Sequence, residues 1–238
     1  MIELVSVVPR GSAEHVAGRP GAPGVTMSVP GGQSLALYGH PHDAATGLFD
    51  VLAGLATPRS GEVWVDGVAV HRLRGTARDR YRARRGLVSP RFGLLPSLSV
   101  SDNVLAAPPA PGAPAPTAAR AAQLLELVGL PALTGPVTGL MAEEQWRVMI
   151  ARALAPAPRL LLAEDPASSL GSRAAGRILD VLADVHEGSG CTLVLLAAHP
   201  ATAARCQRRV LITQTTVAED ELTSGDDAWT RSRIDRIG

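Results

Sequence analysis

Ionisable side chains follow two of the most apolar runs in this sequence of 238 residues. Glu164 and Asp165 come directly after Arg159–Ala163 (RLLLA), and His199 follows closely after Thr192–Ala197 (TLVLLA). Carboxylates are ligands that Mg²⁺ accepts in proteins, so the acidic pair could hold that cation weakly. The alternative is that the pair caps the turn after a strand. One histidine after a strand is a weak signal by itself.

Two further histidines, His40 and His42, lie in a loop after the short apolar run Ser34–Tyr38. Their spacing allows either a metal site or a pH-sensitive contact with an anion. No third ligand is evident nearby, which favours plain loop residues over a metal site.

The elements that must position these side chains can be read from periodicity and length. Strands are expected at residues 1–8, 25–29, 34–38, 61–67, 159–163 and 192–197. Helices are expected at residues 48–55, 117–128, 145–154 and 172–186. Buried apolar strands that alternate with helices are typical of an α/β fold with a parallel sheet covered on both faces.

Composition limits the classes of protein that this chain can belong to. Hydrophobic residues make up 46% and aromatic residues only 3%, so a globular core must be built from small aliphatic side chains. The net charge of +1 argues against a nucleic-acid binder. The two cysteines have no metal or redox spacing, which predicts reduced thiols in the cytosol.

The chain is expected to reach a membrane only by docking onto an embedded partner. No uninterrupted apolar run approaches about 18 residues, and the first ten residues lack the layout of a signal peptide. The expected location is therefore cytoplasmic, peripheral to the inner face of the cell membrane if an embedded partner holds the protein there.

One local stretch is strongly basic. Residues 72–91 contain eight arginines against the single Asp79. Charge runs are usually solvated faces, so a solvated helix or arm is the simpler interpretation. The alternative is a contact with anionic lipid head groups or with an acidic partner.

The order of the segments resembles the ABC-type ATPases, most closely the subfamily for lipoprotein release and macrolide export. The resemblance covers roughly residues 1–213 and rests on the segments SVPGG, YG, LAGL, SGEVWVDG, FGLLPSLSVSDNV, LLELVGL, RVMIARALAPAPRLLLAEDP and LVLLAAHP. It implies a P-loop NTPase-like α/β domain with a parallel core sheet, an antiparallel β-subdomain and a helical sub-lobe at about residues 97–156. Residues 214–238 are then expected to form a polar C-terminal tail.

The resemblance implies a phosphate loop of the form G-x-x-x-x-G-K-[ST], in which backbone N–H groups and the lysine bind phosphates. Gly39 and Thr46 fit this form, but Ala44 replaces the second glycine and Ala45 the lysine. Asp43 places a carboxylate where a phosphate is bound, a repulsion of up to about 4 kcal/mol, or roughly a thousandfold in affinity. The degenerate phosphate loop therefore comprises Gly39, His40, His42, Asp43, Ala44, Ala45, Thr46 and Gly47.

The family ends its second motif strand with Asp and then Glu, which hold Mg²⁺ and orient the attacking water. Here the order is reversed, Glu164 and then Asp165, so each carboxylate has the wrong length for its role. The resemblance makes Thr46 and Glu164 remnants of a Mg²⁺ site. It makes Asp165 and the switch histidine His199 the remnants of the catalytic residues.

Three further motifs are replaced relative to the family. The glutamine of the glutamine loop aligns with Pro90, and the D-loop aspartate aligns with Gly171. The signature L-S-G-G-Q aligns with Leu140, Met141, Ala142, Glu143 and Glu144. Acidic residues suit the positive end of a helix but not a phosphate site, since they are acceptors and anions themselves.

The family likeness implies ATP and Mg²⁺ as ligands, a transmembrane permease as partner, and a homodimer or a heterodimer with a related ATPase subunit. The replaced motifs predict a pseudo-ATPase that keeps the fold. One alternative is a slow ATPase that uses Thr46, Glu164, Asp165 and His199. Another is a stand-alone regulatory or interaction protein without a permease.

Overall fold

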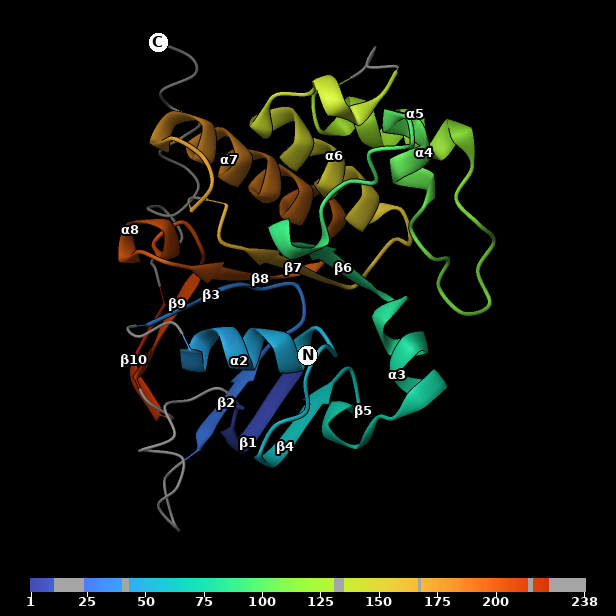
Figure 1. Cartoon of the computed structure of the whole chain (residues 1–238). Helices are drawn as coiled ribbons and strands as arrows, with labels where there is room; N and C mark the ends of the chain where they lie inside the picture. The colour runs from blue at the N-terminus through green and yellow to red at the C-terminus, as the bar shows by residue number, and fades with distance from the viewer. Residues whose placement is uncertain (11–23, 40–42, 131–134, 167, 214–215, 223–238) are drawn as a thin grey trace. The chain divides into compact units, whose positions relative to one another are not determined.

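The structure is a computed structural model, which describes residues 1–10, 24–39, 43–130, 135–166, 168–213 and 216–222 (Figure 1). It divides into two compact units. The first unit combines Met1–Asp79 with Thr192–Gly238, and the second is Arg80–Cys191. His40 and His42 lie outside the described residues, as does the side chain of Asp43.

The first unit contains an antiparallel sheet in the order β2-β1-β4-β5. Its strands are β1 (Ile2–Val8), β2 (Val25–Val29), β4 (Ser60–Val65) and β5 (Val68–Ala69). Buried and exposed residues alternate strictly along β2, as expected of a strand with one face on the core. This sheet confirms the predicted antiparallel β-subdomain.

The first unit also contains parallel strands. Strand β3 (Ser34–Tyr38) lies between β8 (Thr192–Ala197) and β9 (Arg208–Thr213) and runs parallel to both. Every residue of β3 and β8 is buried, which explains why both read as continuous apolar runs. Helices α2 (Asp43–Leu52) and α8 (Pro200–Ala203) contact these strands. The predicted parallel core sheet is confirmed.

The second unit combines two parallel strands with helices. Strand β6 (Arg85–Val88) pairs with β7 (Leu160–Glu164). The helical segments are η2 (Pro90–Phe92), α4 (Val100–Leu105), α5 (Ala118–Leu127), η3 (Val137–Gly139), α6 (Ala142–Leu154) and α7 (Ser172–Ser189). Helix α6 contacts β6, α4, α5 and α7, because both sides of its apolar stretch from Trp146 to Leu154 are buried. No helix in the described part of the chain is long and apolar enough to cross a membrane.

Several boundaries differ from the expectation. Helix α2 begins at residue 43 rather than 48, and α6 at 142 rather than 145. Both extra turns are rich in alanine or glutamate, which favour helix even where no apolar stripe is visible. Helix α3 (Gly75–Arg82), preceded by η1 (Val70–Arg72), lies in the basic stretch for which a solvated helix or arm was the simpler interpretation.

The expected polar tail begins with a strand. Strand β10 (Thr216–Leu222) pairs antiparallel with β9, so residues 216–222 continue the sheet. Cross-strand ion pairs explain why an acidic segment forms a strand here: Arg208 pairs with Asp220 at 2.6 Å, and Arg209 pairs with Glu221. The remainder of the expected tail lies outside the described residues.

Candidate functional site

Two buried alanines lie near the start of α2, in the segment predicted as a phosphate loop. Ala44 and Ala45, near the start of α2, are 2% and 0% exposed. Thr46 is half-buried. Alanine methyl groups cannot donate a hydrogen bond or supply a positive charge, so neither of these two side chains could bind a phosphate.

The two glycines that bracket this stretch are explained by packing. A Cβ atom added at Gly39 would lie 2.1 Å from the carbonyl oxygen of Ile212 in β9. At Gly47 it would lie 2.7 Å from the carbonyl oxygen of Arg10 and 2.8 Å from Cβ of Pro9. Both positions therefore require glycine for close approach of the backbone, whether or not a phosphate binds.

Glu164, expected as a remnant of the Mg²⁺ site, accepts hydrogen bonds from other residues of the chain. Its Oε2 accepts hydrogen bonds from the Ser89 hydroxyl at 2.5 Å and from Arg91 Nε at 2.8 Å. The Glu164 side chain is 13% exposed, and Ser89 is 1% exposed. A half-buried carboxylate with one cation and one hydroxyl donor already has its charge and one oxygen satisfied.

The segment that replaces the glutamine loop supplies both of these partners. Ser89 accepts the backbone N–H of Arg91 at 3.1 Å and so caps η2, in which Pro90 takes the first position. Proline is favoured at that position because its missing N–H needs no partner there. The residues on either side of Pro90 therefore carry the polar contacts. Neither was singled out from the sequence, because both partners lie more than 70 residues from Glu164.

Asp165 lies at a strained position. Its φ is +36°, a region that aspartate tolerates better than most residues. Its Oδ1 is buried and has no hydrogen-bond partner among the described residues. The Asp165 carbonyl accepts from the N–H and the hydroxyl of Ser168 at 3.2 and 2.9 Å. The turn after β7 is thus held through the Asp165 backbone, while the Glu164 carboxylate points to Ser89 and Arg91.

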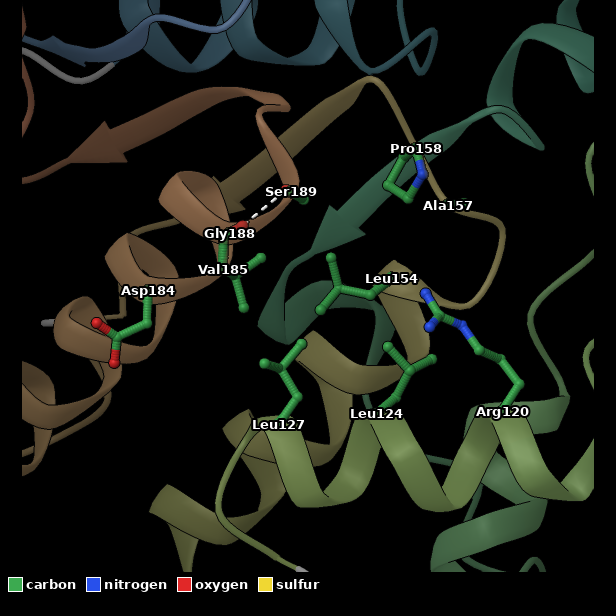
Figure 2. Close-up of a pocket in the computed structure, with 10 residues that line it drawn as sticks. All are labelled: Arg120, Leu124, Leu127, Leu154, Ala157, Pro158, Asp184, Val185, Gly188 and Ser189. Atoms are coloured by element: carbon green, nitrogen blue, oxygen red, sulfur yellow. Dashed lines mark hydrogen bonds between the residues drawn. The ribbon is translucent and has the colours of Figure 1, made fainter.

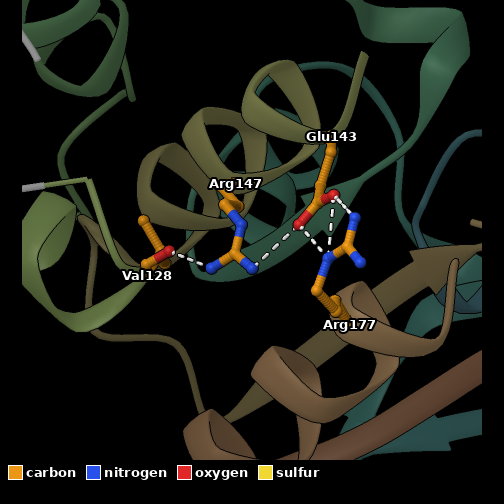
Figure 3. A network of polar contacts seen from close by, with 4 residues as sticks. All are labelled: Val128, Glu143, Arg147 and Arg177. Carbon is orange, nitrogen blue, oxygen red and sulfur yellow. Dashed lines mark hydrogen bonds and ion pairs between the residues drawn. The ribbon is translucent and has the colours of Figure 1, made fainter. Parts of the chain in front are cut away.

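The signature-equivalent segment begins helix α6 (Figure 3). Glu143 accepts from Arg147 Nη2 at 3.0 Å and from Arg177 Nε at 2.9 Å. Arg147 also donates to the carbonyl of Val128 at 2.6 Å, and so ties α6 to the end of α5. Glu144 accepts the N–H of Met141 at 2.8 Å and caps the helix. Both carboxylates have partners within the chain.

The ion pair with Arg177 lowers the pKa of Glu143 to about 2. A group whose pKa falls on folding stabilises the protein above its unfolded pKa, and this contribution disappears between pH 4.5 and about 2. We expect about 1 kcal/mol of stability to be lost over this window, because Arg177 is partly solvated. Urea unfolding at several pH values measures it, and Glu143→Gln should remove this part of the pH dependence. An unchanged slope in the variant would show that other carboxylates account for the effect.

The remaining predicted positions are exposed. Gly171 precedes α7 as its N-cap residue, and His199 precedes α8 in the same way. Near Gly171, Ser169 accepts a hydrogen bond from the indole N–H of Trp146 at 3.0 Å. His199 and α2 belong to the first unit, whereas Glu164, Asp165 and the start of α6 belong to the second.

A cavity of about 390 Å³ lies elsewhere in the second unit, between α5, the end of α6 and α7 (Figure 2). Leu124 and Leu127 from α5, Leu154 from α6 and Val185 from α7 are among its ten lining residues, and none of the predicted site residues lines it. The described residues contain no group of three or more His, Cys, Asp or Glu side chains that could hold a metal ion. The cavity does not add catalytic groups to the candidate site.

The chain resembles proteins of known family. A family model for ABC transporters matches residues 23–168. The lipoprotein-releasing system ATP-binding protein LolD of Syntrophotalea carbinolica is 35% identical over 191 residues, which cover 78% of this chain and 83% of that protein. The methionine import ATP-binding protein MetN of Carboxydothermus hydrogenoformans is 32% identical over 176 residues, 72% of this chain but only 52% of that protein.

Solved structures agree with this fold. The dimeric structure of MJ0796, a bacterial ABC transporter cassette, has a TM-score of 0.79 and 23% identity and covers 94% of this chain and 100% of that one. The structure of cbiO1 from Clostridium perfringens has a TM-score of 0.77 and 19% identity over 99% of this chain and 93% of that one. The family match and the relatives together show that the chain belongs to the family of ABC transporter ATP-binding subunits.

Proposed function

We propose that this chain is a pseudo-ATPase, a subunit that keeps the ABC fold but binds Mg-ATP weakly or not at all. The observation that carries the proposal is the engagement of Glu164 by Ser89 and Arg91. A Mg²⁺ ion bound there would have to share a carboxylate that is 13% exposed with the Arg91 guanidinium. Two cations cannot share one carboxylate without strong mutual repulsion.

The residues present also do not fit the phosphates of ATP. Ala44 and Ala45 replace the phosphate-binding side chains, and both are buried. At the start of α6, Glu143 and Glu144 present negative charge where the family binds phosphate. Phosphate and carboxylate repel each other. The two glutamates also occupy the positive N-terminus of this helix, which would otherwise attract an anion.

The position of ATP between the two subunits of the family's dimers supports the same proposal. In the family, each ATP lies between the phosphate loop of one subunit and the signature of the other. This chain differs from the family at both sequences, so a homodimer would have two poor sites. A heterodimer with an intact partner would also have two poor sites, since one lacks a good loop and the other a good signature.

The segment that faces the permease in this family keeps a defined shape. Asn103 is fully buried, and its side chain bonds the N–H and carbonyl of Leu95 at 2.7 and 3.1 Å. Arg152 donates to the carbonyls of Phe92 and Gly93. Phe92 and Leu95 are each 46% exposed, so this loop presents two large apolar side chains that a partner could cover. We infer that this loop docks the protein onto a transmembrane permease at the inner face of the membrane.

Calorimetric titration of the purified chain with Mg-ATP tests the proposal. We expect no saturable binding tighter than about 1 mM, because the lysine, the Mg²⁺ ligand and the signature are all replaced. A parallel titration with ATP and EDTA separates metal-dependent binding from nonspecific heat. Micromolar binding would overturn the proposal, as would phosphate release that disappears in His199→Ala and so reveals a slow ATPase.

A further inference from the structure

Charge is distributed very unevenly along this chain. Residues 72–85 contain seven arginines and one aspartate, a net charge of +6. The whole chain carries only +1, so all other residues together carry −5. A local charge of this size attracts an anionic surface to this stretch of the chain.

The backbone of this stretch is fixed by one buried side chain and by local hydrogen bonds. Tyr81 in α3 is 4% exposed, and the guanidinium of Arg85 stacks over its ring at 4.5 Å. Arg74 and Arg78 donate to the carbonyl of Leu73 at 2.8 and 2.9 Å. We call residues 72–85, from η1 through α3 to the start of β6, the arginine surface.

Much of the positive charge on the arginine surface has no acidic partner among the residues that the structure describes. The side chains of Arg74 and Arg78 donate to backbone carbonyls, which carry no net charge. Arg80 and Arg84 are exposed and have no acidic partner in the described part of the structure. Arg72 pairs with Glu62 at a distance of 3.8 Å, and its side chain is 68% exposed. Pairs this exposed contribute little and are easily exchanged for another anion.

We propose that the arginine surface binds anionic phospholipid head groups at a membrane. Clusters of four to eight basic residues on a helix are suited to such surfaces, because each charge near the bilayer adds a similar favourable increment. The family of the chain works beside a membrane, which puts such a surface within reach. The proposal goes beyond pseudo-ATPase function, since it requires neither nucleotide nor permease.

The composition of the arginine surface favours lipid over other anionic partners. A stable protein interface needs large apolar or aromatic anchors, but Leu73 is half-buried and Tyr81 is buried. Single-stranded nucleic acids need exposed aromatic rings for base stacking, and Tyr81 is the only aromatic residue between 72 and 85. Head groups of a bilayer need only accessible positive charge, which this helix provides.

Cosedimentation of the full chain with vesicles tests the proposal. We expect binding to phosphatidylcholine vesicles that contain about one-third phosphatidylglycerol, and none to pure phosphatidylcholine. Binding should vanish as salt rises from about 0.1 M to about 1 M, because the Debye length falls from about 10 Å to about 3 Å. Equal binding to neutral vesicles, or no binding to either kind, would overturn the proposal.

A pair of double variants locates the contact. Arg80→Gln/Arg84→Gln should bind anionic vesicles about 25-fold more weakly, at about fivefold for each lost charge. The control Arg159→Gln/Arg173→Gln removes the same charge from two exposed arginines elsewhere, and should bind within about twofold of the unmodified chain. Equal losses in both variants would overturn the assignment to this surface.

Direct binding to other polyanions distinguishes the class of partner. Polyglutamate and a single-stranded oligonucleotide are added, without vesicles, to the unmodified chain and to the Arg80→Gln/Arg84→Gln variant. If either binds through Arg80 and Arg84 while the anionic vesicles do not, the partner is an acidic protein or a nucleic acid and the lipid proposal fails. The vesicle assay contains no ATP and no permease, so its result is independent of the calorimetric test of function.

Discussion

Gly39→Ala is expected to lower the free energy of unfolding by about 3 kcal/mol or more, and to prevent folding at ordinary temperatures if stability is marginal. The added methyl group would lie 2.1 Å from the carbonyl oxygen of Ile212, so β9 or the end of β3 must move. The atom in the way is backbone, which cannot rotate aside as a side chain does. Urea unfolding followed by far-UV circular dichroism measures the loss.

Gly171→Ala is the matched control, because it alters a glycine in another motif position. Gly171 has φ −63° and ψ 153°, which any residue adopts, and an added Cβ would meet nothing within 4 Å. We expect a change within about 0.5 kcal/mol, in either direction. Equal effects of the two substitutions would show that close packing is not what requires glycine at position 39.

Breaking the contact between Arg91 and Glu164 should be the next largest effect. Arg91→Ala leaves a carboxylate that is 13% exposed with the Ser89 hydroxyl as its remaining donor. We expect a loss of about 2 kcal/mol, limited by the partial exposure of Arg91. Glu164→Gln should cost less, and the double variant should cost less than the sum of the two. Denaturant unfolding of the four proteins gives the coupling energy directly.

Two outcomes would contradict this account of Glu164. Additive effects of the two substitutions would mean that the ion pair contributes nothing to stability. A rise in the unfolding midpoint of the unmodified protein on addition of magnesium chloride would mean that the cation competes successfully with Arg91. Arg173→Ala, which removes an exposed arginine on α7, serves as the control for the loss of one positive charge.

Much of the parallel sheet could be predicted from the sequence, because several of its strands are apolar throughout. Strands β3, β7 and β8 are buried almost completely, so their lengths and limits stand out in the sequence. The bounds of helix α3 could not be predicted beyond a solvated helix or arm in the basic stretch, since only Tyr81 among its eight residues is buried and no apolar stripe repeats. Strand β10 is held by charged pairs across the hairpin, which a single sequence does not reveal.

The sequence predicted which motif residues are replaced, but it did not predict the partners of Glu143 and Glu164. Glu143 meets Arg177 across 34 residues, and Glu164 meets Arg91 across 73. Arginines are abundant throughout this chain, so charge alone cannot select the right one. Pairing at such separations depends on how strands and helices pack, which local periodicity does not determine. The role of Gly39 in packing was hidden for the same reason, because Ile212 lies far along the chain.

Arg91 has a consequence for how the protein would respond to conditions in the cell. A metal ion that balances a carboxylate can be withdrawn by a chelator, and its binding follows the supply of nucleotide. A guanidinium on the same chain is not removed by a chelator, and its contact does not depend on nucleotide. The charge of Glu164 therefore stays balanced at every ratio of ATP to ADP. The conformation of a subunit with this arrangement would not follow a cycle of nucleotide binding. Changes in its conformation would have to be driven by its partners.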